Sequence, residues 1–166
     1  DAFFRWVTDV GFTGPDRGRG GKYLFLPPGH RGEIPGGHHV VPTRSYRNWL
    51  LMRAFVIDGD LAKTAAYVKK HWRLYPLKEA ASPREPHFVD LSGLQYSTIH
   101  ANDFSFYEEL NAVVQYEPAD AFNPELVGLW ASIGIKKGKP FAPDERRKQI
   151  LTEAAAVGNA TARALS

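Results

Sequence analysis

The feature that most limits the possible folds is the region between Gly21 and Leu77, where short apolar runs alternate with Pro/Gly turns. One run, Lys22–Leu26, is followed directly by Pro27-Pro28-Gly29, and proline cannot continue a hydrogen-bonded ladder. Two further runs, HHVVPT and NWLLMRAFVI, also have lengths typical of strands. The second has almost no polar face, so we expect it to be buried on both sides. The region therefore predicts two or three strands joined by turns.

A helix is predicted directly after these strands. Its apolar residues recur at spacings of four and three, at Leu61, Ala65, Val68, Trp72 and Tyr75. Asp58 and Asp60 place carboxylates near its amino end, where they can accept hydrogen bonds from free amides and favour the helix dipole. Pro76 is expected to end the helix.

The amino-terminal residues predict one more strand, because residues 2–10 alternate apolar and polar side chains, although imperfectly. Residues 11–22 contain five glycines and a proline, which is typical of a loop. Residues 79–90 are polar with two prolines and predict a linker. We therefore divide the chain into a β portion with its closing helix (1–78), a linker (79–100) and a helical segment (101–166).

Helix signals dominate the last third of the chain. Asn102 or Asp103 can cap a helix that stops before Pro118, and Asn123-Pro124-Glu125 is a cap, a first-turn proline and a first-turn acid. Gly134 is expected at the end of that second helix. Pro143-Asp144-Glu145 opens a last helix that runs to the end of the sequence. The predicted fold class is thus α+β, with about four helices following the strands.

Composition excludes several classes of protein. The chain has no cysteine, which excludes disulfides, thiolate zinc sites and cysteine nucleophiles. No run approaches the length of a membrane-spanning helix, and the first residues lack the pattern of a signal peptide. Residues 1–78 carry a net charge of +7 and residues 79–166 one of −4. This asymmetry fits either an anion-binding surface or two subdomains of opposite charge that face each other.

Familiar catalytic and nucleotide-binding motifs are absent. The sequence GPDRGRGGKY resembles a phosphate loop, but Asp16 stands where that loop needs its first glycine. There is no G-x-S-x-G or H-E-x-x-H, so no catalytic residue can be assigned and no cofactor is expected. A single short Arg-Gly segment does not predict nucleic-acid binding, which needs repetition of such segments.

Three histidines form the sequence cluster that most resembles a metal site: His30, His38 and His39. His38 and His39 are adjacent, and adjacent side chains on a strand point to opposite faces. One metal ion could then reach only one of them, unless Gly36-Gly37 twists the backbone. Metal ligands and exposed loop histidines are both compatible with this pattern.

Arginines and aromatic residues flank the apolar runs, and four of them are the candidate ligand-binding residues: Arg31, Arg44, Tyr46 and Arg53. A guanidinium binds a carboxylate or phosphate through paired hydrogen bonds, and an aromatic ring can stack on a sugar. Arg53 interrupts the most apolar run, so it requires a partner if it is buried. The alternatives are a ligand, an internal ion pair with Asp9 or Asp58, or a strand end that reaches water.

Several of these motifs occur in one order, and the chain thereby resembles the bacterial domain-of-unknown-function family 1254. The resemblance rests on PPGHRGEIPGG, Pro42-Thr43, Arg53 and Pro76-Leu77. A later stretch, DFSFYEELNAVVQYEPADAFNPELVGLWASIGIKKGKPF, resembles the spacer that leads to a family 1214 domain. The resemblance implies a partial, jelly-roll-type antiparallel β-sandwich followed by the helical segment. It also implies a bacterial protein, periplasmic or secreted, although a cytoplasmic location stays open.

The family's activity is not established, so the resemblance supplies no catalytic residue. We expect a binding or structural module, with a small anionic or carbohydrate ligand between sheet and helices. The alternatives are a hydrolase completed by a further domain, in which His71, His87 or His100 would meet a carboxylate and a serine, and a shell-like assembly subunit. The chain resembles a fragment of a longer protein. Another copy of the chain, or the remainder of the full-length protein, is therefore expected to cover its open edges.

Overall fold

The computed structural model describes residues 1–165, which form two units. The larger unit combines residues 1–49 with the residues from Thr98 onward, and the smaller unit is Leu50–Ser97. This grouping differs from the predicted division at residues 78 and 100. The amino-terminal β portion and the helical segment belong to one unit, whereas the apolar run NWLLMRAFVI and the helix after it belong largely to the other.

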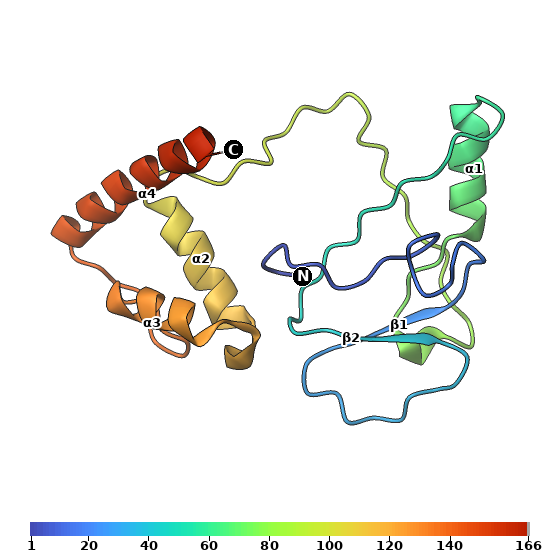
Figure 1. Cartoon of the computed structure of the whole chain (residues 1–166), viewed down its shortest axis with the longest axis horizontal. Helices are drawn as coiled ribbons and strands as arrows, with labels where there is room; N and C mark the ends of the chain where they lie inside the picture. Colours follow the sequence, from blue (N-terminus) through green and yellow to red (C-terminus); the bar gives the residue numbers. More distant parts are fainter. Residues whose placement is uncertain (166) are drawn as a thin grey trace. The chain divides into compact units, whose positions relative to one another are not determined.

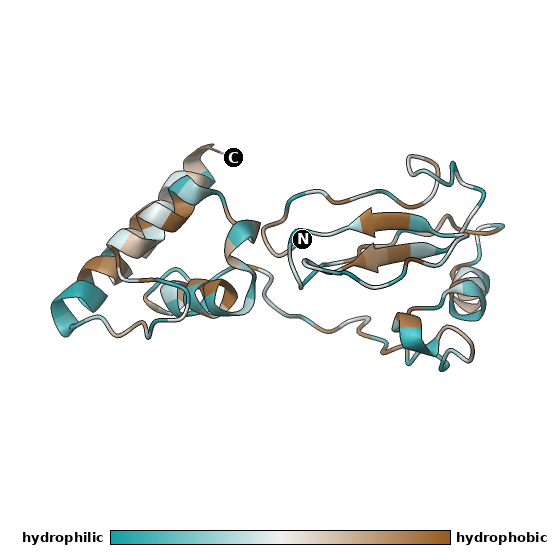
Figure 2. Ribbon diagram, turned by 90° about the horizontal axis from the view of Figure 1, so that it is seen from below, coloured by the Kyte–Doolittle hydropathy of each residue, from teal (hydrophilic) through white to brown (hydrophobic). Residues whose placement is uncertain are grey.

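The larger unit contains one pair of strands, β1 (Tyr23–Leu26) and β2 (His39–Pro42), as Figure 1 shows. The strands are parallel, and Tyr23 pairs with His39 while Leu26 pairs with Pro42. Leu24, Leu26 and Val41 are buried. Figure 2 shows that both strands are hydrophobic. Both predicted strands are therefore confirmed in position, with Pro42 at the end of its strand, where a missing amide costs least.

The α+β class is confirmed, but the structure does not show an antiparallel sandwich of jelly-roll type. Within residues 1–165 the only ladder longer than an isolated bridge is the parallel pair. The loop of residues 27–38 returns the chain to the start of β1, so that both strands run in the same direction. A parallel pair needs a connection of about a dozen residues, and this loop supplies it.

The predicted strand at residues 2–10 is wrong, because hydrogen bonds close a turn there. The Asp1 carboxylate accepts hydrogen bonds from the amides of Phe3 and Arg5, at 2.9 and 3.1 Å, and pairs with the Arg5 guanidinium. Phe4 has a positive φ of 55°, which no strand residue adopts. These local bonds outweigh the alternating pattern.

The predicted strand in NWLLMRAFVI is also wrong. Residues 48–56 form no helix or strand, and Trp49 is 66% exposed. The expected burial on both sides is therefore not observed. A strand needs a ladder with a neighbour, and within the described residues this run takes part only in the isolated bridge between Ile57 and Asp60.

The helical segment follows the prediction closely. It contains α2 (Ser105–Tyr116), the 3₁₀ turn η2 (Ala119–Ala121), α3 (Pro124–Ser132) and α4 (Glu145–Leu165). The cap position of α2 is Phe104, one residue after the predicted Asp103, whose carboxylate accepts the Ser105 amide. The Asn123 side chain caps α3 as predicted and accepts the Glu125 amide. Asp144 likewise accepts the Arg147 amide. The cap of α3 is Ile133, and the predicted Gly134 follows it with φ 98°.

The core of the larger unit lies among these helices. Four buried residues form it: Val114, Ala121, Phe122 and Ile135. Phe3 also packs there, with its ring centroid 4.7 Å from that of Phe122 in an edge-to-face arrangement. The amino-terminal turn thereby anchors the β portion to the helical core.

The smaller unit is built around α1 (Leu61–His71), followed by the 3₁₀ turn η1 (Leu77–Glu79). Asp60 is the predicted cap and accepts the Lys63 amide at 3.0 Å. The helix ends at His71, five residues before Pro76, so Trp72 and Tyr75 lie outside it. Thr64 is its only buried residue, and the predicted apolar stripe is therefore mostly uncovered. Among residues 1–165, no helix has both the length and the apolar character that a membrane span requires.

Candidate functional site

The turn that follows β2, residues 43–47, is the most tightly bonded part of the larger unit. Thr43 is buried, and its hydroxyl donates to the carbonyls of Leu26 and Ser45 at 2.9 and 3.0 Å. Ser45 is also buried; its hydroxyl donates to the Arg47 carbonyl and accepts the Ala2 amide. Such local side-chain bonds replace the strand ladder that ends at Pro42.

Glu117 holds this turn against the helical segment. Its side chain is fully buried, and its carboxylate accepts the Tyr46 amide at 2.6 Å and the Arg47 amide at 3.1 Å. A buried carboxylate requires such donors, because removal from water is costly unless its oxygens are hydrogen-bonded. The two amides come from residues 70 and 71 positions earlier in the sequence. Glu117 is therefore the main long-range polar connection of the turn.

Lys137 completes the connection from the other side. Its ammonium donates to the carbonyls of Val114, Gln115 and Glu117, at 3.3, 2.8 and 2.6 Å. These carbonyls lie at the end of α2, where helical partners are missing and a positive charge is favoured by the dipole. The position of Glu117 is thus fixed through both its backbone and its side chain.

The exposed side of the same turn presents cations and aromatic rings. The Arg47 guanidinium lies 4.1 Å from the centroid of the Tyr116 ring, and the Tyr46 ring meets Tyr116 edge-on at 6.0 Å. Tyr46 and Tyr116 are 49% and 50% exposed. Arg44 is also exposed, and among residues 1–165 neither Arg44 nor Arg47 makes an ion pair. We call Arg44, Tyr46, Arg47 and Tyr116 the arginine–tyrosine surface.

The four predicted ligand-binding residues lie in three separate segments of the chain. Arg44 and Tyr46 belong to the arginine–tyrosine surface, whereas Arg31 lies exposed in the loop between β1 and β2. Arg53 belongs to the smaller unit.

Arg53 is exposed, so it does not need the buried partner that its apolar neighbours implied. The two carboxylates expected to pair with it bind other groups. Asp58 pairs with Lys63, and Asp9 accepts the indole N–H of Trp6. Arg53 instead borders an apolar hollow of about 270 Å³ between its own segment and α1, lined also by Tyr67 and Trp72.

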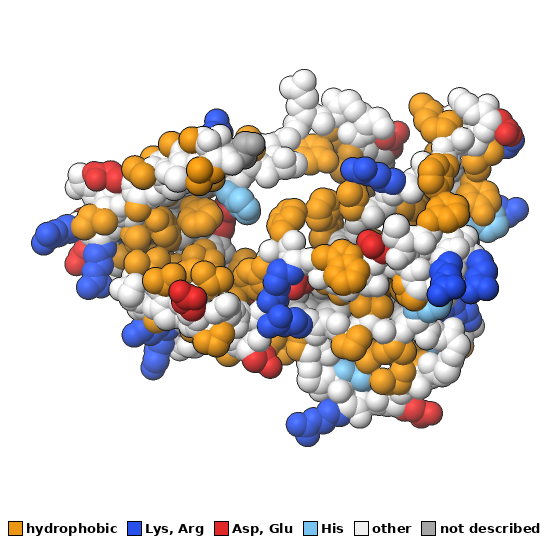
Figure 3. Space-filling view, viewed as in Figure 1, with side chains coloured by type: hydrophobic (Ala, Val, Ile, Leu, Met, Phe, Trp, Pro, Cys, Tyr) orange, Lys and Arg blue, Asp and Glu red, His pale blue; other side chains and the backbone are white. Residues whose placement is uncertain are grey.

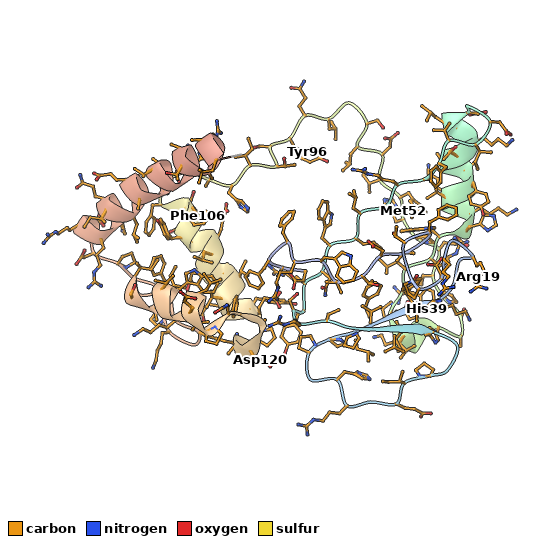
Figure 4. The ribbon with its side chains drawn as sticks, in the orientation of Figure 1. Arg19, His39, Met52, Tyr96, Phe106 and Asp120 are labelled. Carbon is orange, nitrogen blue, oxygen red and sulfur yellow. The ribbon has the colours of Figure 1, made fainter. Side chains whose placement is uncertain are left out.

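The three histidines considered as metal ligands have separate surroundings. The Nδ1 atom of His38 lies 3.0 Å from the Gly36 carbonyl. His39 begins β2 (Figure 4). Its ring lies 4.9 Å from that of Tyr23. Over residues 1–165, no three His, Asp or Glu side chains are grouped so that they could share a metal ion. Metal binding by His30, His38 and His39 stays a prediction, which a zinc titration can test.

The histidines considered for hydrolysis have few of the required neighbours. His100 Nδ1 lies 3.7 Å from a carboxylate oxygen of Glu109, and the His71 ring packs on Tyr67 at 4.3 Å. The hydrolase hypothesis, with His71, His87 or His100 beside a carboxylate and a serine, stays a prediction.

Asp16, considered only as a departure from a phosphate loop, has a clear structural role. Its side chain accepts the Tyr23 hydroxyl at 2.5 Å and the amides of Gly11 and Gly20 at 2.8 and 3.0 Å. The Tyr23 hydrogen bond, together with the two amides, lowers the pKa of Asp16 below its ordinary value of 3.8. Burial, with the hydrogen bond to Asp16, raises the pKa of Tyr23. Asp16 therefore closes the glycine-rich loop onto β1.

Sequence reasoning missed Glu117 and Tyr116. One signal was available for Glu117, since a carboxylate directly after a helix and before Pro118 is unfavourable for the helix dipole. The unfavourable interaction with the helix dipole must be offset by other bonds, and the hydrogen bonds from the two amides of the turn supply them. Tyr116 gave no signal, because its contact with Arg47 joins parts of the chain that are far apart in sequence.

Comparison with known proteins identifies a similar family, but the description of that family names no activity. Residues 1–76 match the model of the family described as "Protein of unknown function (DUF1254)". The match ends before the helical segment, so the resemblance of that segment to the spacer of family 1214 stays a prediction. A search of curated proteins found no match.

Proposed function

We propose from the geometry that this chain, whose residues 1–76 match the DUF1254 family of unknown function, is a binding module. The ligand is a small anionic molecule or a carbohydrate, bound at the arginine–tyrosine surface. The observation that carries the proposal is the Arg47 guanidinium stacked on Tyr116 above a turn that Glu117 holds in place.

The chemistry of this surface fits such a ligand. Stacking on a ring leaves the edge of a guanidinium open for paired hydrogen bonds to a carboxylate or phosphate. Glu117 is the nearest acid along the chain to Tyr116, but its oxygens are used by two backbone amides. The positive charge of Arg47 thus stays available, and the exposed rings of Tyr46 and Tyr116 offer stacking faces for a sugar.

Titration with glucuronate, glucose and inorganic phosphate, followed by amide NMR, tests the proposal. An anionic ligand shifts the amides of the turn with glucuronate and phosphate, and a neutral sugar site responds to glucose as well. Arg47→Ala keeps the backbone amide that Glu117 accepts, so the fold is retained. We expect this variant to weaken binding about tenfold or more, which is the loss expected for a charge-assisted hydrogen bond.

Arg146→Ala is the matched control, because it removes an exposed arginine from α4 and leaves the turn unchanged. If none of the three probes shifts the turn at millimolar concentration, or if Arg146→Ala weakens binding as much as Arg47→Ala, the proposal is wrong.

We further propose that the β portion is part of a jelly-roll-type sandwich completed by a partner, either another copy or the remainder of the full-length protein. The exposed side chains of Trp49, Leu50 and Leu51, which lie outside any strand, support this proposal. A periplasmic or secreted setting for the parent protein is proposed from the family resemblance alone.

A further inference from the structure

A second apolar hollow, again of about 270 Å³, lies in the helical segment, and we call it the helical hollow. Its walls come from α2, α3 and the residues beside them, and the main apolar side chains are those of Val114, Phe122, Val127, Trp130 and Ile135. The volume is just below the range of about 300–1,000 Å³ found for pockets that hold drug-sized ligands, so the helical hollow suits a smaller molecule. An apolar hollow gives water few hydrogen-bond partners, and such cavities take up apolar molecules.

The turn after α3 forms one side of the helical hollow, and hydrogen bonds to α2 fix its position. Gly134 has φ 98°, a conformation that favours glycine, and it lets the chain turn back after α3. The Gln115 side chain donates to the Lys136 carbonyl and accepts the Gly138 amide, both at 2.8 Å. The Lys137 ammonium adds its three bonds to carbonyls at the end of α2. A site whose walls are held in place before the ligand arrives loses less entropy on binding.

Two exposed lysines place positive charge at the edge of the helical hollow. Lys136 and Lys137 both line it, and neither makes an ion pair within residues 1–165. Lys137 uses its N–H groups on three backbone carbonyls, whereas the Lys136 ammonium makes no hydrogen bond to the described part of the chain. The charge of Lys136 is therefore available to an anion that binds at this edge.

The indole N–H of Trp130 is a further unused donor beside the helical hollow. Trp130 is half-buried, and its ring packs edge-to-face on that of Phe122, with the centroids 5.1 Å apart. Its N–H makes no hydrogen bond within residues 1–165. A buried tryptophan N–H usually has a hydrogen-bond partner, and an oxygen atom of a bound ligand can supply one.

We propose that the helical hollow binds a small carboxylate with an apolar tail, of the size of a medium-chain fatty acid. The tail lies among the apolar walls, and the carboxylate pairs with the Lys136 ammonium at the edge. Figure 3 shows hydrophobic side chains on the surface of the helical segment, with basic side chains around them. Burial of the tail is favoured in proportion to the apolar area removed from water, and the lysine selects an anionic head group over a neutral or cationic one. This inference does not depend on ligand binding at the arginine–tyrosine surface.

Amide NMR titrations with octanoate, octanol and octylammonium test the proposal, because these probes share one apolar tail and differ in the charge of the head group. Octanoate should shift the amides of residues 127–137, which include most of the lining of the helical hollow. We expect it to bind about tenfold more tightly than octanol, and octylammonium to bind more weakly than either. The proposal is overturned if octanoate shifts none of these amides at millimolar concentration, or if octanol or octylammonium binds as tightly as octanoate.

Two pairs of variants separate the contribution of the charge from that of the apolar walls. Lys136→Glu should weaken octanoate binding about tenfold or more and leave octanol binding unchanged. Lys139→Glu is its matched control, because Lys139 is an exposed lysine of the same turn outside the lining. Val127→Trp fills the helical hollow from α3 and should abolish binding of both probes, whereas Leu129→Trp changes an exposed position of α3 outside the lining and should not. Equal loss in Lys136→Glu and Lys139→Glu, or unchanged binding in Val127→Trp, contradicts the proposal.

The two proposed sites are distinguished by the amides that shift. Glucuronate should shift the turn of residues 43–47, octanoate should shift residues 127–137, and Arg47→Ala should leave octanoate binding unchanged. A chain that binds octanoate but none of glucuronate, glucose and phosphate overturns only the site at the arginine–tyrosine surface, and the reverse result overturns only the site in the helical hollow.

Discussion

Replacement of Glu117 by alanine tests whether the turn after β2 depends on one carboxylate. The change removes the only acceptor for the amides of Tyr46 and Arg47, which lie 2.6 and 3.1 Å from its oxygens. A hydrogen bond to a charged group contributes about 1.5–3 kcal/mol, so the loss of two lowers the free energy of unfolding by roughly 3–6 kcal/mol. That is a large fraction of the about 5–15 kcal/mol expected for a domain.

Glu117→Gln separates the contribution of charge from that of shape. The amide retains one oxygen of similar position, so one amide keeps an acceptor and the other loses it. We expect the loss for glutamine to be about half that for alanine. Urea unfolding followed by tryptophan fluorescence measures both, and Trp130 in the helical core reports the transition.

Glu125→Ala is the control, because Glu125 is an exposed acid in the same segment. It should change the free energy of unfolding by no more than about 0.5 kcal/mol. The reasoning is refuted if Glu117→Ala costs less than about 1 kcal/mol while the amides of Tyr46 and Arg47 keep their protection from hydrogen exchange.

Two further predictions concern the loop and the core of the larger unit. Because its pKa is lowered in the folded chain, ionised Asp16 stabilises the fold above its ordinary value of 3.8, and this contribution is lost as pH falls through the lowered value. Asp16→Asn should therefore be less stable than wild type at neutral pH and should approach it in acid; parallel melting curves at pH 7 and below pH 3.8 would contradict this. Ile135→Ala should lower the free energy of unfolding by about 2–5 kcal/mol, because Ile135 is a large apolar side chain that is almost completely buried in the helical core. Chemical denaturation measures it, and a loss below about 1 kcal/mol would show that the core collapses into the space.

The elements that the sequence predicted correctly are those with local causes. Caps at Asp60, Asn123 and Asp144 define helix starts through hydrogen bonds between residues two or three positions apart. Prolines and glycines likewise delimit β1 and β2. Such signals act within one turn of the chain, so a single sequence contains them in full.

The failures share a different cause, which is pairing over long distances. The apolar run after Trp49 has the composition of a buried strand, but composition does not provide a neighbouring strand, and residues 50–56 belong to no ladder of the described chain. Arg53 is exposed, which agrees with the alternative in which its side chain reaches water. The parallel direction of the β1–β2 pair depends on how the loop between the strands returns, which no residue pattern encodes.

The candidate site was half predictable. Arg44 and Tyr46 were selected for their chemistry, and the structure places them on one turn. Glu117 and Tyr116 became visible only when the fold brought residues about 70 positions apart into contact. Arg31 had the same chemistry as Arg44 but lies in another loop, so residue type alone could not separate the two.

The connection between β1 and β2 has a practical consequence for protein engineering. Residues 27–38 form no helix or strand, and most of their side chains are exposed. The entropy of closing a flexible loop rises only slowly with length, by about 0.6 kcal/mol for each doubling. An epitope tag or a fluorescent reporter inserted at Gly36-Gly37 should therefore be carried with little loss of stability, which offers a labelling position away from both the arginine–tyrosine surface and the helical core.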